Sequence, residues 1–256
     1  MISPKIKVLK SHGKQYIPDL RNVTLTEEFR GRAILTEGGD NERLEEAAAI
    51  CPTRAICTSP LSLDLGRCLF CGECARIAPD SIRFTNDYRI GAPTREALII
   101  RPGQTRVEFD AESVRKEIKK YFGHALKLRQ VSAGGDNSVE MELNASGNVN
   151  FDFGRYGVEF VASPRHADGV VITGPITKAM AEALEICYQA IPSPKVVIVC
   201  GSEACSGGLY AESRAIDRSF FERHKVDLWL PGAPTHPMTF IDGVMTLIGK
   251  KEPSNR

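Results

Sequence analysis

Apolar and polar positions follow two different patterns along this chain. In the second half, short runs of aliphatic and β-branched residues alternate with longer stretches that carry apolar residues at helical spacing. The run Val196–Cys200 is apolar throughout, as expected for a strand buried on both faces of a sheet. Strands that alternate with helices of this length predict βαβ units and a parallel sheet.

The predicted elements of the second half follow one another between residues 126 and 250. The strands are expected at 126–131, 158–161, 169–173, 196–200 and 226–230. The helices are expected at 139–144, 177–190, 208–214 and 237–248. This order predicts an α/β flavodoxin-like parallel sheet domain.

The first half is less regular. Residues 1–40 mix short β-prone pieces such as Ile6–Leu9 with prolines and glycines, which predicts an extended N-terminal arm. Leu44–Ile50 has the composition of two helical turns, and Pro52 ends them. Short strands are expected at the end of this half, at 81–84 and 97–101.

Domain boundaries follow from these patterns. We expect a first domain with its arm over 1–108, a connecting segment with a helix at 109–125, a second domain over 126–250 and a disordered tail at 251–256. The connecting helix is equally compatible with a surface helix of the second domain.

Composition narrows the classes of function. Lysine and arginine number 33 against 32 acidic residues, so a broad basic surface is excluded and no nucleic-acid partner is expected. Apolar runs are too short for a transmembrane helix, and no apolar stretch follows Met1 as a secretory signal requires. The chain has eight cysteines, five of them within 24 positions. In a chain of cytosolic character this clustering favours a metal site over disulfides.

Three of the cysteines form the run C-L-F-C-G-E-C at Cys68, Cys71 and Cys74. The spacing C-x2-C-x2-C wraps three thiolates around one iron–sulfur cube, and a remote Cys-Pro supplies the fourth in bacterial two-cluster ferredoxins. Cys51-Pro52 is such a pair. The four cysteines therefore predict one [4Fe–4S] cluster in a ferredoxin-like α+β domain; zinc is the less favoured alternative. Cys57 fits neither ligand pattern, and we expect it to be a small buried residue.

The same ferredoxin pattern would hold a second cluster, and its ligands are missing. Its positions correspond to Asn41, Leu44, Ala47 and the pair Ala78-Pro79, none of which is cysteine. Loss of all four together indicates that a whole cluster site has been abandoned.

Four segments of the second half carry a family resemblance. They are R-Q-V-S-A-G-G-D-N-S-V-E-M-E-L-N at 129–144, F-V-A-S-P-R-H-A-D-G-V-V-I-T-G-P-I-T at 160–177, G-S-E-A-C-S-G-G at 201–208 and P-G-A-P-T-H-P at 231–237. Over roughly 112–249 the chain resembles the 20 kDa iron–sulfur subunit that complex I shares with group 4 [NiFe] hydrogenases, including formate hydrogenlyase. The arm, with F-R-G-R at 29–32, and the ferredoxin region resemble the ferredoxin-like subunit of the same complexes.

The resemblance implies a proximal [4Fe–4S] cluster whose ligand positions fall here on Asp136, Val139, Glu203 and Ala233. Because none is cysteine, we expect that cluster to be absent. Cys205 matches a further cysteine of some members. The resemblance also suggests a proton path through Glu140, Glu203 and His236. The acidic residues of this region are equally compatible with ordinary solvated loop positions.

These observations predict an iron–sulfur subunit of a membrane-associated complex related to complex I and energy-converting hydrogenases. It would transfer electrons through one [4Fe–4S] cluster, and whether it takes part in catalysis stays open. The alternative is a non-redox structural or coupling subunit with a structural or sensing cluster. Kinship implies a hydrogenase-like large subunit and membrane antiporter-like subunits as partners, with a soluble electron carrier as a further candidate. The expected location is peripheral, on the cytoplasmic side of the membrane.

Overall fold

Parallel strands form the central sheet of the second half. In the computed structural model, which describes residues 4–13, 16–20, 22–110 and 112–250, five strands pair in the order β10-β9-β8-β6-β7. Their bounds are Leu126–Ser132 for β6, Val158–Phe160 for β7, Gly169–Thr173 for β8, Val196–Cys200 for β9 and Leu228–Leu230 for β10. All pairings between them are parallel, and the order is that of flavodoxin, as predicted.

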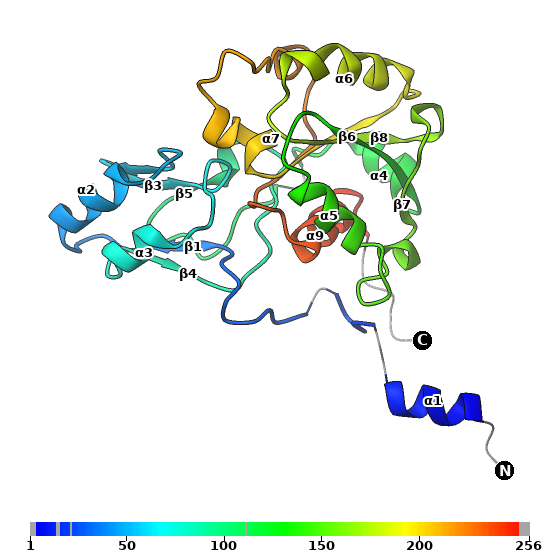
Figure 1. Cartoon of the computed structure of the whole chain (residues 1–256), viewed down its shortest axis with the longest axis horizontal. Helices are drawn as coiled ribbons and strands as arrows, with labels where there is room; N and C mark the ends of the chain where they lie inside the picture. The colour runs from blue at the N-terminus through cyan, green and yellow to red at the C-terminus, as the bar shows by residue number, and fades with distance from the viewer. Residues whose placement is uncertain (1–3, 14–15, 21, 111, 251–256) are drawn as a thin grey trace.

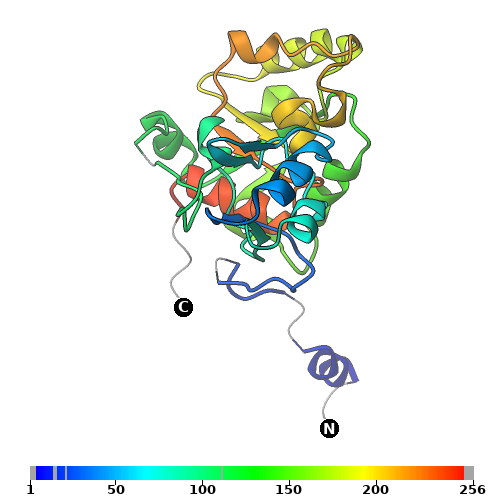
Figure 2. The same cartoon turned by 90° about the vertical axis from the view of Figure 1, so that its left-hand side faces the viewer.

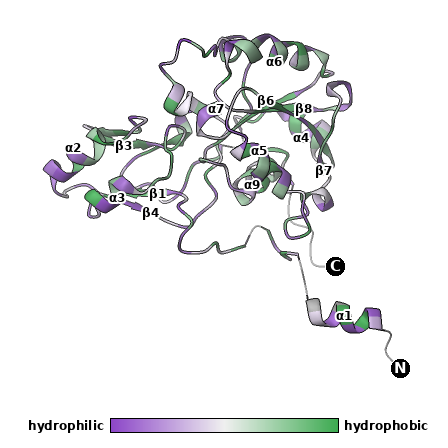
Figure 3. Ribbon diagram, in the orientation of Figure 1, coloured by the Kyte–Doolittle hydropathy of each residue, from purple (hydrophilic) through white to green (hydrophobic). Residues whose placement is uncertain are grey.

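Helices cover both faces of this sheet (Figure 1). Helix α6 (Lys178–Ala190) lies on one face, while α4 (Lys116–Phe122), α5 (Ser138–Ala145) and α9 (Pro237–Leu247) lie on the other. The side chains of β8 alternate between the faces, with Val170 and Ile172 in the hydrophobic cluster on the α6 side and Val171 in the other. Most of α9 is buried, and Figure 3 colours it largely hydrophobic.

Short helices and turns complete the second half. They are α7 (Ser202–Ser206), α8 (Phe220–Arg223), and the 3-10 turns η2 (Phe153–Tyr156), η3 (Pro164–His166) and η4 (Gly208–Tyr210). The helix predicted over 208–214 is wrong beyond residue 210. Gly207 and Gly208 both have positive φ, which breaks the helix after α7. The connecting helix begins at Lys116, later than predicted, because the Asp110 side chain accepts from Glu112 N in a turn.

The described part of the first half has α+β architecture. Two antiparallel sheets occur in it: β1 (Ala33–Leu35) with β4 (Ile82–Phe84), and β2 (Ile56–Thr58) with β3 (Leu61–Asp64) and β5 (Ile99–Ile100). The helices are α2 (Asn41–Ala49) and α3 (Glu73–Ile77), and the 3-10 turn η1 (Glu96–Leu98) precedes β5. This matches the expected ferredoxin-like arrangement beside the flavodoxin-like one.

The N-terminal arm differs in part from the expectation. Its first described segment is a helix, α1 (Pro4–His12), which lies apart from the body of the molecule in both Figure 1 and Figure 2. The prediction of an extended arm is therefore wrong for these residues: Pro4 suits the first helical turn, and four neighbouring residues alone do not separate a strand from a helix. The tail at 251–256 lies outside the described residues.

The rest of the arm runs across both halves. Ile17 N donates to Asn150 O (2.9 Å), and the buried Leu20 accepts at its carbonyl from the Tyr88 hydroxyl (2.9 Å). Beyond Tyr88, Ala92 and Trp229 exchange both backbone hydrogen bonds, at 2.9 and 2.8 Å. This antiparallel bridge adds the end of the first half to the β10 edge of the parallel sheet.

Candidate functional site

The four predicted cluster ligands line one cavity. Cys51 follows the C-cap residue of α2, Cys68 and Cys71 lie in the loop between β3 and α3, and Cys74 lies within α3. The cavity has a volume of about 310 Å3, and all four cysteines face it. Much of the remaining lining is apolar: Ala47, Ile50, Ala55, Ile56, Leu63, Leu69 and Phe84.

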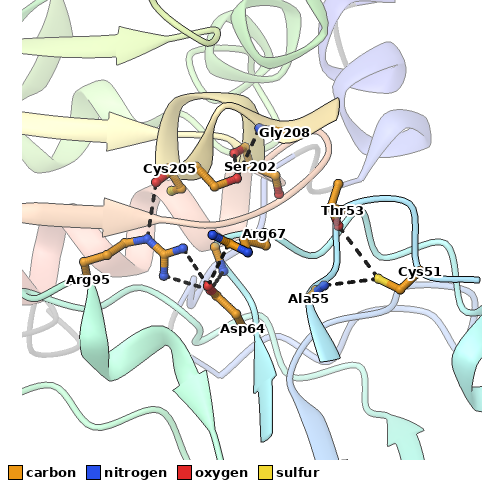
Figure 4. Close-up of polar contacts among 11 residues, drawn as sticks. Cys51, Thr53, Ala55, Asp64, Arg67, Arg95, Ser202, Cys205 and Gly208 are labelled. Atoms are coloured by element: carbon orange, nitrogen blue, oxygen red, sulfur yellow. Dashed lines mark hydrogen bonds and ion pairs between the residues drawn. The ribbon is translucent and has the colours of Figure 1, made fainter. Parts of the chain in front are cut away.

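Backbone N–H groups point at two of the sulfurs. Phe70 N donates to Cys68 Sγ (3.2 Å), and Ala55 N donates to Cys51 Sγ (3.3 Å; Figure 4). Phe70 has a φ of 53° and Gly72 a φ of 84°, so the loop between Cys68 and Cys74 passes twice through the left-handed region. Hydrogen bonds of this kind stabilise the negative charge of thiolate ligands.

The chemistry of these four donors fits an iron–sulfur cluster. Among the described residues, no group of three or more His, Cys, Asp or Glu side chains is arranged to hold one metal ion. In a [4Fe–4S] cube each thiolate binds a different iron, so the sulfurs surround a cavity and do not converge on one point. Four cysteines around an apolar cavity, with N–H groups aimed at sulfur, fit that group. Burial raises the pKa of Cys68, and burial raises that of Cys74 to about 11, so binding as thiolates would release protons.

Three of the positions where the ferredoxin pattern would place ligands of a second cluster are core residues. Leu44, Ala47 and Ala78 belong to the same buried hydrophobic cluster, and Asn41 is the first residue of α2. Cys57 differs from the expectation of burial: it is exposed on β2. The prediction is wrong because β2 is an edge strand of its sheet and Cys57 lies on its outer face.

A polar network joins the cysteine loop to the parallel sheet, and Figure 4 shows the part of it formed by Asp64, Arg95 and Cys205. Both oxygens of Asp64 accept from Arg95, at 2.7 and 2.8 Å, and Arg95 Nε donates to Cys205 O (3.2 Å). The buried Ser202 hydroxyl of α7 donates to Cys68 O (2.6 Å). The loop that carries Cys68 is thus held directly by α7, the helix that follows β9.

Replacing Ser202 with alanine is expected to destabilise the protein by about 1–3 kcal/mol, because Cys68 O would then be buried without this donor. Equilibrium urea unfolding measures the loss. The control is Ser62→Ala, whose exposed hydroxyl donates to Pro60 O at 3.5 Å. Equal stability of the Ser202→Ala and Ser62→Ala proteins would contradict this role of Ser202.

The four positions of the implied proximal cluster lie at the carboxyl end of the parallel sheet. Asp136 Oδ1 accepts from Ser138 N (2.9 Å) and from the Ser138 hydroxyl (2.6 Å), which fixes the start of α5. Val139 is buried beside Gly201, where a Cβ would lie 2.7 Å from a Val139 methyl. Glu203 lies in the first turn of α7, and Ala233 is exposed in the turn after β10.

The residues of the suggested proton path lie at the same end of the sheet. Glu140 is buried and accepts from the Thr173 hydroxyl (2.5 Å). His236 Nδ1 accepts from Met238 N (3.1 Å) at the start of α9, and burial lowers the pKa of His236. Glu203 is partly buried near Glu140. Among the described residues no hydrogen bond joins any two of these three side chains, so the path stays a prediction.

Among these residues, Glu203 is the one whose ionisation is expected to make the stability of the protein depend on pH. Burial, and then the charges of Asp136 and Glu140, raise its pKa. The folded state therefore holds this proton at pH values where the unfolded state, with a pKa of about 4.3, has lost it. Stability contributed by Glu203 falls as pH rises from the unfolded pKa through the folded one.

Glu203→Gln removes this dependence, so the variant should gain stability relative to the wild type between pH 4 and pH 7. Urea unfolding of both proteins across that range measures the gain, and Glu222→Gln, an exposed position, is the control. A gain that is independent of pH would contradict the pKa shift as its cause.

The described fold and site define a class of protein: a flavodoxin-like α/β domain with a ferredoxin-like region whose four cysteines share one cavity. The sequence model of "NADH ubiquinone oxidoreductase, 20 Kd subunit" matches residues 137–247. The probable membrane-bound hydrogenase subunit mbhJ of Pyrococcus furiosus is 31% identical over 134 residues, which cover 52% of this chain and 80% of that protein. The B-type subunit of the NADH-quinone oxidoreductase of Geotalea daltonii is 38% identical, over 44% of this chain and 68% of its own length. The chain therefore belongs to the 20 kDa subunit family.

A more distant likeness exists among solved structures. A chain of the membrane-bound sulfane sulfur reductase, an archaeal respiratory membrane complex, covers 55% of this chain and 75% of its own, with a TM-score of 0.45 and 23% identity. This likeness is too distant to decide function. No helix in the described residues is both long and apolar enough to cross a membrane.

Several residues around the cysteine cavity were not predicted as site residues. Ser202 and Arg95 reach the loop from segments far away in sequence, so no local spacing marks them. Arg30 also contacts the loop, and its one signal in the sequence is its place in the F-R-G-R motif.

Proposed function

We propose that this chain is the iron–sulfur subunit of a membrane-associated complex related to complex I and energy-converting hydrogenases. In this proposal it transfers electrons through one [4Fe–4S] cluster held by Cys51, Cys68, Cys71 and Cys74. The observation that carries the proposal is that these four cysteines line one cavity. The bound cluster would supply one-electron transfer; the chain supplies the thiolates, the N–H donors and the apolar surroundings.

The proposed location and partners of this chain are inferred from its relatives. Their names describe a subunit of a membrane-bound hydrogenase and subunits of NADH-quinone oxidoreductase. We infer a peripheral position on the cytoplasmic side of a membrane, next to a hydrogenase-like large subunit and antiporter-like membrane subunits. A soluble carrier is a further candidate for delivering electrons to the cluster, because Cys71 is exposed.

The proposal includes the absence of the proximal cluster. Asp136, Val139, Glu203 and Ala233 supply no thiolate, and [4Fe–4S] clusters are held by cysteine thiolates. Val139 is buried in apolar packing beside Gly201, so this position offers no donor atom.

Iron analysis and low-temperature EPR of the purified chain test how many clusters it binds. One cubane per chain should give about four irons and a single reduced-cluster signal. Iron for two cubanes would show that the ligand assignment is incomplete. A chain that binds zinc and no iron would overturn the proposal.

A structural or coupling role is the second candidate function, and the missing proximal thiols favour it, because electrons would have no second cluster to reach. Cys71→Ser in the assembled complex discriminates between the two. If the complex assembles and still translocates ions without the cluster, the coupling role is correct. If assembly persists and translocation stops, electron transfer through this cluster is required.

A further inference from the structure

The cysteine loop has a positively charged neighbour from a distant part of the chain. Arg30, in the N-terminal arm, donates from Nε to Phe70 O at 2.5 Å. A Cβ on Gly72 would lie 3.1 Å from Arg30 Cδ, so the arginine stem lies against the loop at Gly72. Arg30 also lines, together with Cys71, a cavity of about 230 Å3 on the side of the loop toward Ala233.

A single residue, Phe70, connects Arg30 to the proposed cluster ligand Cys68. Phe70 accepts from Arg30 at its carbonyl and donates from its N–H to Cys68 Sγ (3.2 Å). Phe70 has the left-handed conformation, and Arg30 holds its carbonyl. The Arg30 guanidinium is therefore held at the loop that carries Cys68 and Cys71.

Other charges near the loop do not directly neutralise the positive charge of Arg30. Glu73, which lines the cysteine cavity, is paired with Arg76 at 2.7 Å. Glu28 lines the same smaller cavity as Arg30, and both residues are exposed, so solvent screens both charges; the Arg30 side chain is in addition held by its hydrogen bond to the loop. No carboxylate among the described residues forms an ion pair with Arg30 within 4.0 Å; its described polar partner is the Phe70 carbonyl.

We infer that Arg30 is a positioning residue that sets the reduction potential of the cluster, an inference that rests on the proposed function. Reduction adds one electron to the cube and breaks no bond, so the cluster and its thiolates gain one negative charge. A cation held beside the loop stabilises the reduced form more than the oxidised form. Arg30 thus raises the potential.

Redox titration of the full-length chain with dithionite, followed by EPR, tests this inference. Arg30→Gln should keep its iron, and its ratio of reduced to oxidised cluster at a fixed potential should fall about tenfold, which is about 59 mV for a one-electron couple. Arg30→Lys keeps the charge and should stay close to the wild-type potential. Arg101→Gln is the control, since exposed Arg101 lines neither cavity.

The results of this titration distinguish a failure of the proposed function from a failure of the inference about Arg30. A wild-type chain without a cubane overturns the proposed function itself. With a cubane in the wild type, the inference about Arg30 fails if Arg30→Gln keeps the wild-type potential, if it cannot hold iron, or if Arg30→Lys shifts as far as Arg30→Gln. It also fails if Arg101→Gln shifts equally, because net charge alone would then be the cause.

Discussion

The Cys68→Ser protein is expected to purify without its cubane and without the EPR signal of a reduced cluster. Cys68 is buried, faces the common cavity and accepts an N–H bond from Phe70, and the described lining of that cavity contains no fifth cysteine to replace it. A serine hydroxyl is a far poorer donor to iron in this setting than a thiolate. Iron content per chain and EPR after dithionite reduction measure the effect.

Cys57→Ser is the matched control for this change. Cys57 is also a cysteine of the first half, but it is exposed on β2 and does not line the cavity. Its replacement should leave iron content and signal unchanged. A full cubane in the Cys68→Ser protein would show that the cluster uses a different ligand set.

The largest expected effect on stability comes from a partly buried ion pair at the start of the connecting helix, in which the carboxylate is the buried partner. The Asp227 side chain is 2% exposed, and its two oxygens accept from Arg115 at 2.8 Å each. Arg115→Met would leave a buried carboxylate whose remaining described partner is Val197 N, at 2.9 Å. Breaking such a pair costs about 3–5 kcal/mol, which equilibrium urea unfolding can measure.

Arg223→Met provides the comparison. Arg223 pairs with Glu185 at 3.1 Å, with side chains 50% and 22% exposed. Exposed pairs contribute about 0–1 kcal/mol, so this variant should remain near the wild type. If both variants lose the same free energy, burial of Asp227 is not what makes the Arg115 pair important.

The parallel sheet could be predicted well because its strands carry an unambiguous pattern. The runs at β8 and β9 are apolar throughout, since both faces are covered, and their predicted bounds agree with the structure. The alternation of strands and helices predicted parallel pairing, but alternation alone does not fix the order of the strands. The edge strand β10 is shorter than expected, by its first two residues.

The first half was harder to predict because its elements are short. Strands β2 and β3 have three and four residues and show no period long enough to recognise. Helix α1 lies apart from the body, so no packing pattern marks it. For the candidate site, the spacing of Cys68, Cys71 and Cys74 predicts ligands, and the structure brings these cysteines to one cavity. The contacts from Arg30, Arg95 and Ser202 depend on tertiary structure.

The bridge between Ala92 and Trp229 joins the ferredoxin-like part of this chain to its parallel sheet. Where ferredoxin-like and sheet-bearing parts are separate polypeptides, their association depends on concentration. Here one chain carries both, so their ratio is fixed at synthesis and each meets the other at the high effective concentration of a tethered partner. Excess or orphaned copies of either part therefore cannot accumulate, and the interface can remain intact even if its intrinsic affinity is modest.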